Sequence, residues 1–213
     1  MTDDALKQRI LLAMLPDVPF EGWNRAALRR TAAKLGHDEA ETDSLFPGGA
    51  RDAVACFSAW ADRETEKALA RKKLETLKVR ERIALGVLSR FEILTPYREA
   101  VRRMLAFLAL PANLPLAARL LYRTTDAIWF AAGDRATDFS FYTKRGLLAG
   151  VYASTTLYWL DDKSKDGEAT SQFLDRRISE VMQIPKIRGR IKESLGSVAN
   201  PLRALRALRR RAV

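Results

Sequence analysis

The chain has 213 residues, of which 47% are hydrophobic and 30% charged, and a formal net charge of +11. Its length and apolar content predict one globular domain with a sizeable core and exclude a disordered chain. The single cysteine, Cys56, excludes an intramolecular disulfide framework and fits a reducing compartment. With one histidine besides, His37, no Cys/His zinc site can be assembled, and we expect neither metal nor cofactor.

The spacing of apolar residues predicts helices along nearly the whole chain and almost no strand. Pro16 and Pro19 end the first helix, Asn24 can cap the second, and Gly36 is its expected stop. The predicted helices cover residues 6–13, 25–35, 38–45, 50–73, 79–94, 97–109, 116–132, 140–160 and 170–182. The expected fold class is therefore all-α, with a single domain over residues 1–183.

The first sixty residues have the spacing of a helix-turn-helix, with Trp23 and Phe57 as candidates for its core. This arrangement resembles the N-terminal half of TetR-type repressors, in which a larger helical bundle, here residues 61–183, holds an apolar ligand pocket. The candidate recognition helix, however, carries Asp38, Glu39, Glu41 and Asp43 and no basic residue. DNA phosphates repel such a helix, because cationic contacts dominate binding there. We therefore expect no nucleic-acid binding.

Nine of the eighteen aromatic residues fall between Tyr122 and Trp159, around turns at Gly133 and Asp138. Aromatic rings beside turns on a helical scaffold favour recognition of apolar ligands or proteins, although core packing explains single rings equally well. No nucleophile–base pair, phosphate loop or Glu-x-x-His motif accompanies them. These features predict a binding protein rather than an enzyme. Gly146 and Gly150 predict close helix packing, within the domain or at a dimer interface.

Residues 184–213 form a basic tail, with nine basic residues and one acid after residue 185 and a charge of +8. Its apolar side chains recur at helical spacing, with Pro201 at the start of a second helical segment. A basic amphipathic helix of this kind lies in the interface of an anionic membrane, although a solvated tail or a helix docked on the domain remains an alternative. The predicted membrane-binding residues are Ile187, Ile191, Leu195, Leu202, Leu205 and Leu208.

Several blocks of the sequence, taken in order, resemble the lipid-binding accessory protein family of coenzyme Q biosynthesis, the ninth Coq protein. The blocks are Arg82-Ile83, LSRFEILTPY from Leu88, Leu110-Pro111-Ala112-Asn113, DAIWFAAGDRATD from Asp126, residues 139–156 and FLDRRI from Phe173. The resemblance implies a TetR-like fold, a homodimer, a terminal membrane-binding helix and a pocket for an isoprenoid quinone or phospholipid. The wide apolar faces of the C-terminal helices independently predict a cavity of several hundred Å³.

The predicted lipid-binding residues are Leu88, Phe91, Met104, Phe107, Leu108, Leu120, Leu121, Leu148 and Tyr152. The resemblance also implies delivery of quinone intermediates to the demethoxyubiquinone hydroxylase, a di-iron enzyme. The family's partner-binding patch falls on Ile128, Trp129, Asp138, Phe141, Tyr142 and Arg145, although the family usually has Trp at the position of Phe141.

We expect the protein in the cytoplasm and peripheral on the inner membrane, because its apolar runs are too short to span a bilayer. A TetR-type regulator that senses an apolar ligand is the alternative, and the acidic third helix favours the accessory protein.

Overall fold

The computed structural model describes residues 2–133 and 139–182, with the backbone alone for residues 139–143. All regular structure in these ranges is helical, which confirms the expected fold class. The helices are α1 Asp3–Met14, α2 Val18–Glu21, α3 Arg25–Lys34, α4 Glu39–Leu45, α5 Ala50–Ala70, α6 Val79–Leu94, α7 Arg98–Leu108, α8 Leu114–Ala131 and α9 Phe139–Asp161. A last described helix covers residues 168–182, and short 3-10 turns occupy Leu74–Thr76, Thr95–Tyr97, Pro111–Asn113 and Lys165–Gly167.

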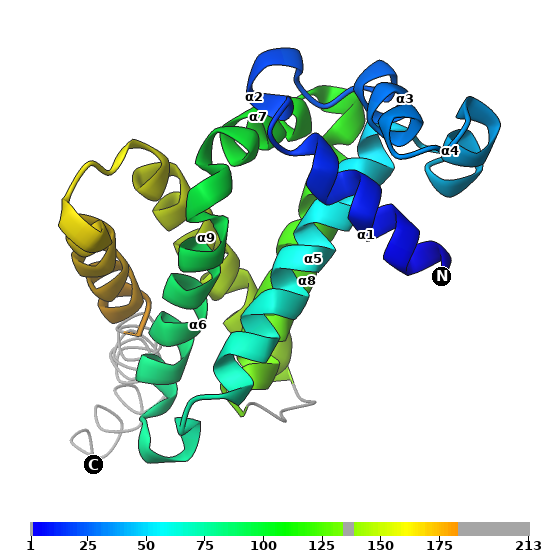
Figure 1. Ribbon diagram of the computed structural model, residues 1–213. Coiled ribbons are helices and arrows are strands. Elements are labelled where there is room, and N and C mark those ends of the chain that lie inside the picture. Colours follow the sequence, from blue (N-terminus) through cyan, green and yellow to red (C-terminus); the bar gives the residue numbers. More distant parts are fainter. Residues whose placement is uncertain (1, 134–138, 183–213) are drawn as a thin grey trace, which may run out of the picture.

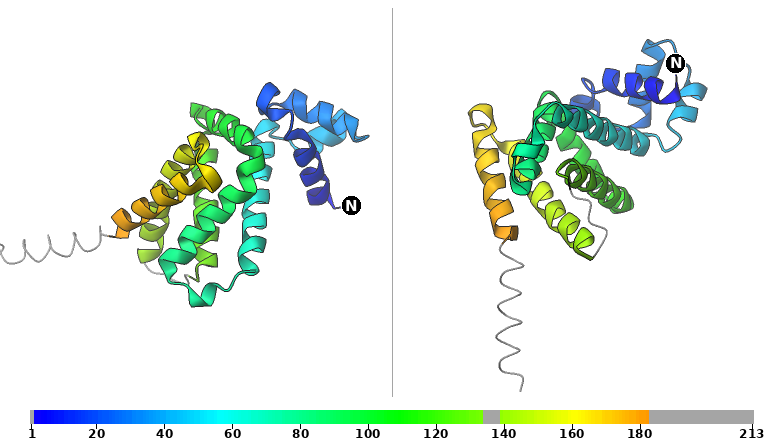
Figure 2. Two further views of the ribbon diagram at one scale, coloured as in Figure 1. Left: turned by 60° about the vertical axis from the view of Figure 1, so that its left-hand side comes forward. Right: turned by 90° about the horizontal axis from the view of Figure 1, so that it is seen from below.

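The helices form two connected groups (Figure 1). The short helices α1 to α4 gather near one end of α5, which continues from this group into the bundle. There α5 packs along α6 and α8, and α8 packs along α9. Figure 2 shows the N-terminal helices and the helix over residues 168–182 on opposite sides of this bundle. The predicted boundary between residues 60 and 61 falls inside α5, so the two parts share a continuous helix.

The helix-turn-helix is built by the capping residues that the sequence offers. Asn24 accepts a hydrogen bond from the amide of Ala27 at 2.8 Å and begins α3. Gly36 has a φ of +87°, a left-handed conformation that ends this helix at little steric cost. Asp38 then accepts from the amide of Glu41 at 2.8 Å and caps α4. The short helix α2 was not predicted, because Pro16 and Pro19 favour an irregular segment there.

An aromatic cluster joins the N-terminal helices to the bundle. The rings of Trp23 and Phe57 lie 5.5 Å apart between centroids, and Trp60 meets Tyr97 at 5.5 Å. The indole nitrogen of Trp23 also donates to the carbonyl oxygen of Ala100, a residue of α7, at 3.1 Å. Such pairs add to the free energy of burying the rings. The predicted core roles of Trp23 and Phe57 are confirmed, and their contacts extend beyond the helix-turn-helix.

Three glycines show where helices approach and where they do not. A Cβ atom at Gly86 of α6 would lie 3.0 Å from Cγ2 of Ile128 on α8, so this glycine permits the close crossing of the two helices. Gly146 and Gly150 on α9, by contrast, have nothing within 4 Å of a Cβ position. The close packing predicted for this pair therefore does not occur among the described residues of one chain.

Within the described residues, no single helix combines the length and apolar character required to cross a membrane. One pair of segments, Val79–Leu108 and Pro111–Ala131, passes that test jointly but is bent by 100°.

Candidate functional site

An apolar pocket with a volume of about 330 Å³ opens between α6, α7, α8 and α9. Its size lies in the ordinary range for small-ligand sites. Leu114 and Leu157, which are 54% and 61% exposed, stand at its mouth. The residues lining it are Ser58, Arg90, Val101, Met104, Leu105, Leu108, Ala109, Leu114, Ala117, Leu120, Leu121, Thr124, Tyr152, Ala153, Thr156 and Leu157. The pocket is thus apolar along most of its wall and open toward solvent through leucine side chains.

A polar cluster forms the inner end of this pocket. Arg90 of α6, which is 3% exposed, donates from Nε to the Tyr152 hydroxyl at 2.8 Å and from Nη1 to Oδ1 of Asp62 at 2.5 Å. Thr124 of α8 donates to the same Asp62 oxygen at 2.9 Å, and the Ser58 oxygens lie 3.4 and 3.5 Å from Arg90 Nη2. The cluster therefore connects α5, α6, α8 and α9 at one point.

The charge of Arg90 is stabilised despite its burial. Burial alone would lower the pKa of its guanidinium, but its interactions with Tyr152 and Asp62 outweigh the burial and raise the pKa above its ordinary value. The cation persists at all accessible pH values and needs Asp62 for its neutralisation. The predicted set of site residues omitted Arg90, Asp62, Ser58 and Thr124. A cation among the apolar residues of α6 was the available signal, since charged side chains are almost never fully buried unless paired.

The residues predicted to bind lipid divide among four places. Met104, Leu108, Leu120, Leu121 and Tyr152 line the apolar pocket. Leu88 and Phe91 border a separate, more polar groove beside α6 instead, and Phe91 supports the ring of Tyr152 at 5.9 Å. Phe107 packs against the core and lines none of the described cavities.

Leu148, the last of the predicted lipid-binding residues, lies in a small groove of about 210 Å³ between α6, α9 and the helix over residues 168–182. Trp129 of α8 lines the same groove and donates from its indole nitrogen to the carbonyl oxygen of Lys144 at 3.1 Å. Val79 and Met182, which are 50% and 54% exposed, lie at its surface. This small groove therefore joins one predicted lipid-binding residue to one predicted partner-binding residue.

The predicted partner-binding patch needs one correction. Ile128 is 3% exposed and packs against Gly86, so its side chain belongs to the core and cannot contact a partner directly. Arg145 is also buried and pairs with Asp126, with 2.6 Å between Nε and Oδ1. Both side chains face inward because of the way α8 and α9 pack against each other and against α6. Asp138 and the side chains of Phe141 and Tyr142 lie outside the described residues, as do all the predicted membrane-binding residues.

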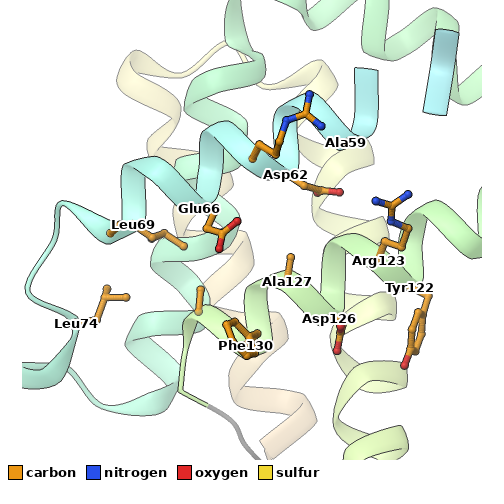
Figure 3. Close-up of a pocket in the computed structure, with 13 residues that line it drawn as sticks. Ala59, Asp62, Glu66, Leu69, Leu74, Tyr122, Arg123, Asp126, Ala127 and Phe130 are labelled. Atoms are coloured by element: carbon orange, nitrogen blue, oxygen red, sulfur yellow. The ribbon is translucent and has the colours of Figure 1, made fainter. Parts of the chain in front are cut away.

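A wider groove of about 660 Å³ runs between α5 and α8 on the other side of the polar cluster (Figure 3). Asp62, Glu66, Arg123 and Asp126 line it, and the ring of Phe130 lies at its edge. Asp62 borders this groove, whereas its partners Arg90 and Thr124 border the apolar pocket. The ion pair and the hydrogen bond of Asp62 thus form a partition between a charged groove and an apolar cavity.

The acidic helix α4 is neutralised by α3. Oδ1 of Asp43 lies 2.8 Å from Nη1 of Arg25, its Oδ2 lies 2.5 Å from Nη2 of Arg29, and Glu39 meets Arg29 at 2.8 Å. Hydrogen bonds from Arg29 and then Arg25 lower the pKa of Asp43 to about 2. Arginines that would meet phosphates in a DNA-binding module are thus already engaged inside this one.

Comparison with solved structures defines the class of the protein. A TetR transcriptional regulator from Nitrosomonas europaea superposes with a TM-score of 0.67 and 21% sequence identity, over 84% of this chain and 98% of the other. The fold is therefore that of a TetR-like helical protein, as the sequence pattern predicts.

Comparison with known sequences narrows this class to a family. Residues 114–185 match the family model described as COQ9. The rat and human proteins named "Ubiquinone biosynthesis protein COQ9, mitochondrial" are each 32% identical over 91% of this chain. COQ9-B of Xenopus laevis is 36% identical over 85% of it. The chain belongs to the COQ9 family, and it spans 64%, 63% and 64% of the length of these three relatives.

Proposed function

We propose that this chain is a non-catalytic lipid-binding accessory protein of ubiquinone biosynthesis. It holds isoprenoid quinone intermediates in the apolar pocket and presents them to the demethoxyubiquinone hydroxylase at a membrane surface. The observation that carries the proposal is the pocket itself, which has an apolar wall, a volume of about 330 Å³ and exposed leucines at its mouth. Membership of a family whose relatives are named ubiquinone biosynthesis proteins supports the choice of ligand.

The remaining parts of the proposal rest on surfaces outside the pocket. The small groove around Trp129 adjoins the start of α9, where Phe141 and Tyr142 stand, and this region is the expected contact for the hydroxylase. The open face of α9 at Gly146 and Gly150 suits a second copy of the chain, which supports a homodimer. The basic tail over residues 184–213 is the expected membrane contact.

A TetR-type regulator is the second candidate function. The fold favours it, since the superposed structure is described as a transcriptional regulator. The ion pairs of Arg25 and Arg29 with Asp43 and Glu39 oppose it, because these cations are not available to phosphate groups. Fold alone does not establish function, and these ion pairs support the accessory protein.

Filling the pocket tests the proposal. Ala117 lines the pocket on α8, whereas the adjacent Ala118 is exposed and lines none of the described cavities, so the two form a matched pair. We expect Ala117→Trp to abolish the binding of a short-chain ubiquinone and Ala118→Trp to leave it unchanged. Lipids extracted from the purified wild-type protein and identified by mass spectrometry should include isoprenoid quinones. Equal binding by both variants, or an extract without such lipids, would contradict the proposal.

A further inference from the structure

We propose that the hydroxyl of Tyr152, held by Arg90 and Asp62, donates a hydrogen bond to an uncharged oxygen on the polar end of the bound lipid. The ligand then enters with its ring first, such as a benzoquinone, and leaves its isoprenoid chain in the apolar part of the pocket and beyond its mouth. This inference rests on the proposed lipid-binding function and adds to it the orientation of the ligand and a preference for neutral headgroups over phosphate.

The Tyr152 hydroxyl can still donate its own proton in a hydrogen bond. A phenolic hydroxyl can accept and donate at the same time, and this one accepts from Nε of Arg90 at 2.8 Å. Among the residues that the structure describes, no acceptor for the proton of Tyr152 is found. Tyr152 lines the apolar pocket together with Arg90. An oxygen of a ligand in that pocket is the acceptor that completes the network.

Aromatic packing fixes the position of this donor. The ring of Tyr152 stacks on Phe91 with 5.9 Å between centroids, and Phe91 stacks on Trp159 at 5.0 Å. The guanidinium carbon of Arg90 lies 5.9 Å from the centre of the Tyr152 ring. A donor held in this way loses little conformational entropy when a ligand binds, so its hydrogen bond contributes efficiently to affinity.

The charge of the cluster selects neutral headgroups. Arg90 contributes one positive charge and Asp62 one negative charge, so their ion pair has no net charge. A phosphate placed beside the pair would be a buried anion without a countercharge, which costs several kcal/mol. A quinone carbonyl brings no charge and needs a donor, which Tyr152 supplies. A headgroup of this kind therefore fits the inner end better than that of a phospholipid.

Burial along the pocket gives the direction of entry. The lining residues at the polar end are almost fully buried, with Arg90 and Thr124 each 3% exposed and Ser58 4% exposed. The leucines at the mouth are more than half exposed. A volume of about 330 Å³ accommodates a ring and the first part of its side chain rather than a full isoprenoid chain. The remaining chain must leave through the apolar mouth.

Tyr152→Phe in the full chain tests the inference, with Tyr158→Phe as the matched control on the exposed side of α9. The probes are a benzoquinone with a two-isoprene side chain, an isoprenoid hydrocarbon of similar length and a short-chain phosphatidylglycerol, titrated by tryptophan fluorescence. We expect Tyr152→Phe to weaken binding of the quinone about tenfold, in line with the loss of one buried hydrogen bond. Binding of the hydrocarbon should not change, and the control should match the wild type for all probes.

The outcomes separate this inference from the proposed function. If the wild type binds neither the quinone nor the hydrocarbon, the proposed function fails and the inference fails with it. If the wild type binds both but Tyr152→Phe weakens them equally or not at all, only the inference is overturned. Phosphatidylglycerol binding that exceeds quinone binding and depends on Tyr152 would overturn the preference for a neutral head.

A spectroscopic measurement on the wild type avoids any dependence on the folding of the variant. With the quinone carbonyls labelled by carbon-13, infrared difference spectra should show a carbonyl band shifted to lower frequency on binding. A band at the frequency seen in apolar solvent would mean that no hydrogen bond forms, and the inference would be wrong.

Discussion

Arg90 of α6 and Asp62 of α5 form a buried ion pair, with 2.5 Å between Nη1 and Oδ1 and side chains that are 3% and 16% exposed. The pair lies where the apolar pocket and the groove between α5 and α8 come closest, and it is joined by Thr124 and Tyr152. Buried pairs of this kind contribute little net stability when compared with apolar side chains, but losing one partner is costly. The pair and its two hydrogen bonds link α5, α6, α8 and α9 at one point.

The first prediction concerns this dependence. Asp62→Ala leaves the cation of Arg90 without its countercharge and should lower the free energy of unfolding by ~3 kcal/mol. Glu66→Ala, one turn further along α5 at an exposed position, should change it by less than ~0.5 kcal/mol. Urea denaturation of both variants measures the difference. Equal stability of the two variants would mean that the pair is not required for the packing of the bundle.

Much of the fold was accessible from the sequence because local signals agree with the tertiary structure. Asn24 and Gly36 predict helix ends through capping chemistry that depends on neighbouring residues only, and the structure has these ends. The length of α6 also matches its prediction, Val79–Leu94. The family resemblance supplied the arrangement of the helices, which the periodicity of single helices does not determine.

The site was predicted less completely because its members meet through long-range packing. Asp62 and Tyr152 are 90 residues apart in the sequence, and neither has a local signal for contact with Arg90. Ile128 shows the converse problem, since it lies beside Trp129 in a motif of the resemblance but points into the core. Its contact with Gly86 of α6 depends on how the two helices cross, which the motif does not encode.

The second prediction is the absence of specific DNA binding. Arg25 and Arg29 are bound to carboxylates of α4, so these two cations are not available to release counterions from phosphate. Fluorescence anisotropy with labelled genomic fragments at low salt should show no sequence preference. The double variant Glu39→Gln/Asp43→Asn frees both arginines and should increase non-specific binding. Sequence-specific binding by the wild type, with a steep dependence on salt, would support the TetR-type regulator instead.

The third prediction is a pH dependence at the same place. Hydrogen bonds from Arg29 and Arg25 lower the pKa of Asp43 from its ordinary value of 3.8 to about 2. A lowered pKa means that the pairing stabilises the fold fully above about pH 4 and that this contribution is lost as the pH falls through about 2. The melting temperatures of the wild type and Asp43→Asn should therefore differ by a constant amount at neutral pH and converge between pH 4 and pH 2. A difference that has vanished at pH 5 would contradict the assignment.

The fourth prediction is that the basic tail makes the membrane contact. Ending the chain after Gln183 removes the net charge of +8 and the amphipathic stripe. Each basic residue near an anionic surface contributes ~1 kcal/mol, so the truncated protein should no longer pellet with anionic vesicles. The triple change of Leu202, Leu205 and Leu208 to Asp should have the same effect. Circular dichroism checks that the helical domain remains folded, and continued sedimentation of the truncated chain would show that the contact lies elsewhere.

The fifth prediction concerns the partner-binding patch at the start of α9. Phe141 and Tyr142 are adjacent on one helix, so at most one of their rings can point into the core, and Tyr142 is the expected outward ring. Aromatic residues at the centre of an interface are typical binding hot spots. Tyr142→Ala should weaken association with the hydroxylase about thirtyfold, which corresponds to ~2 kcal/mol, with little change in melting temperature.

Trp129→Ala provides the contrast for this measurement. The ring of Trp129 is half-buried in the small groove and its indole nitrogen is bonded to the carbonyl of Lys144, so its removal should lower the melting temperature clearly. Association is measured by surface plasmon resonance with the purified hydroxylase, and stability is measured by calorimetry on the same samples. If Tyr142→Ala instead causes a large fall in melting temperature and leaves the affinity for the hydroxylase unchanged, Tyr142 is a core residue and the partner binds at another surface.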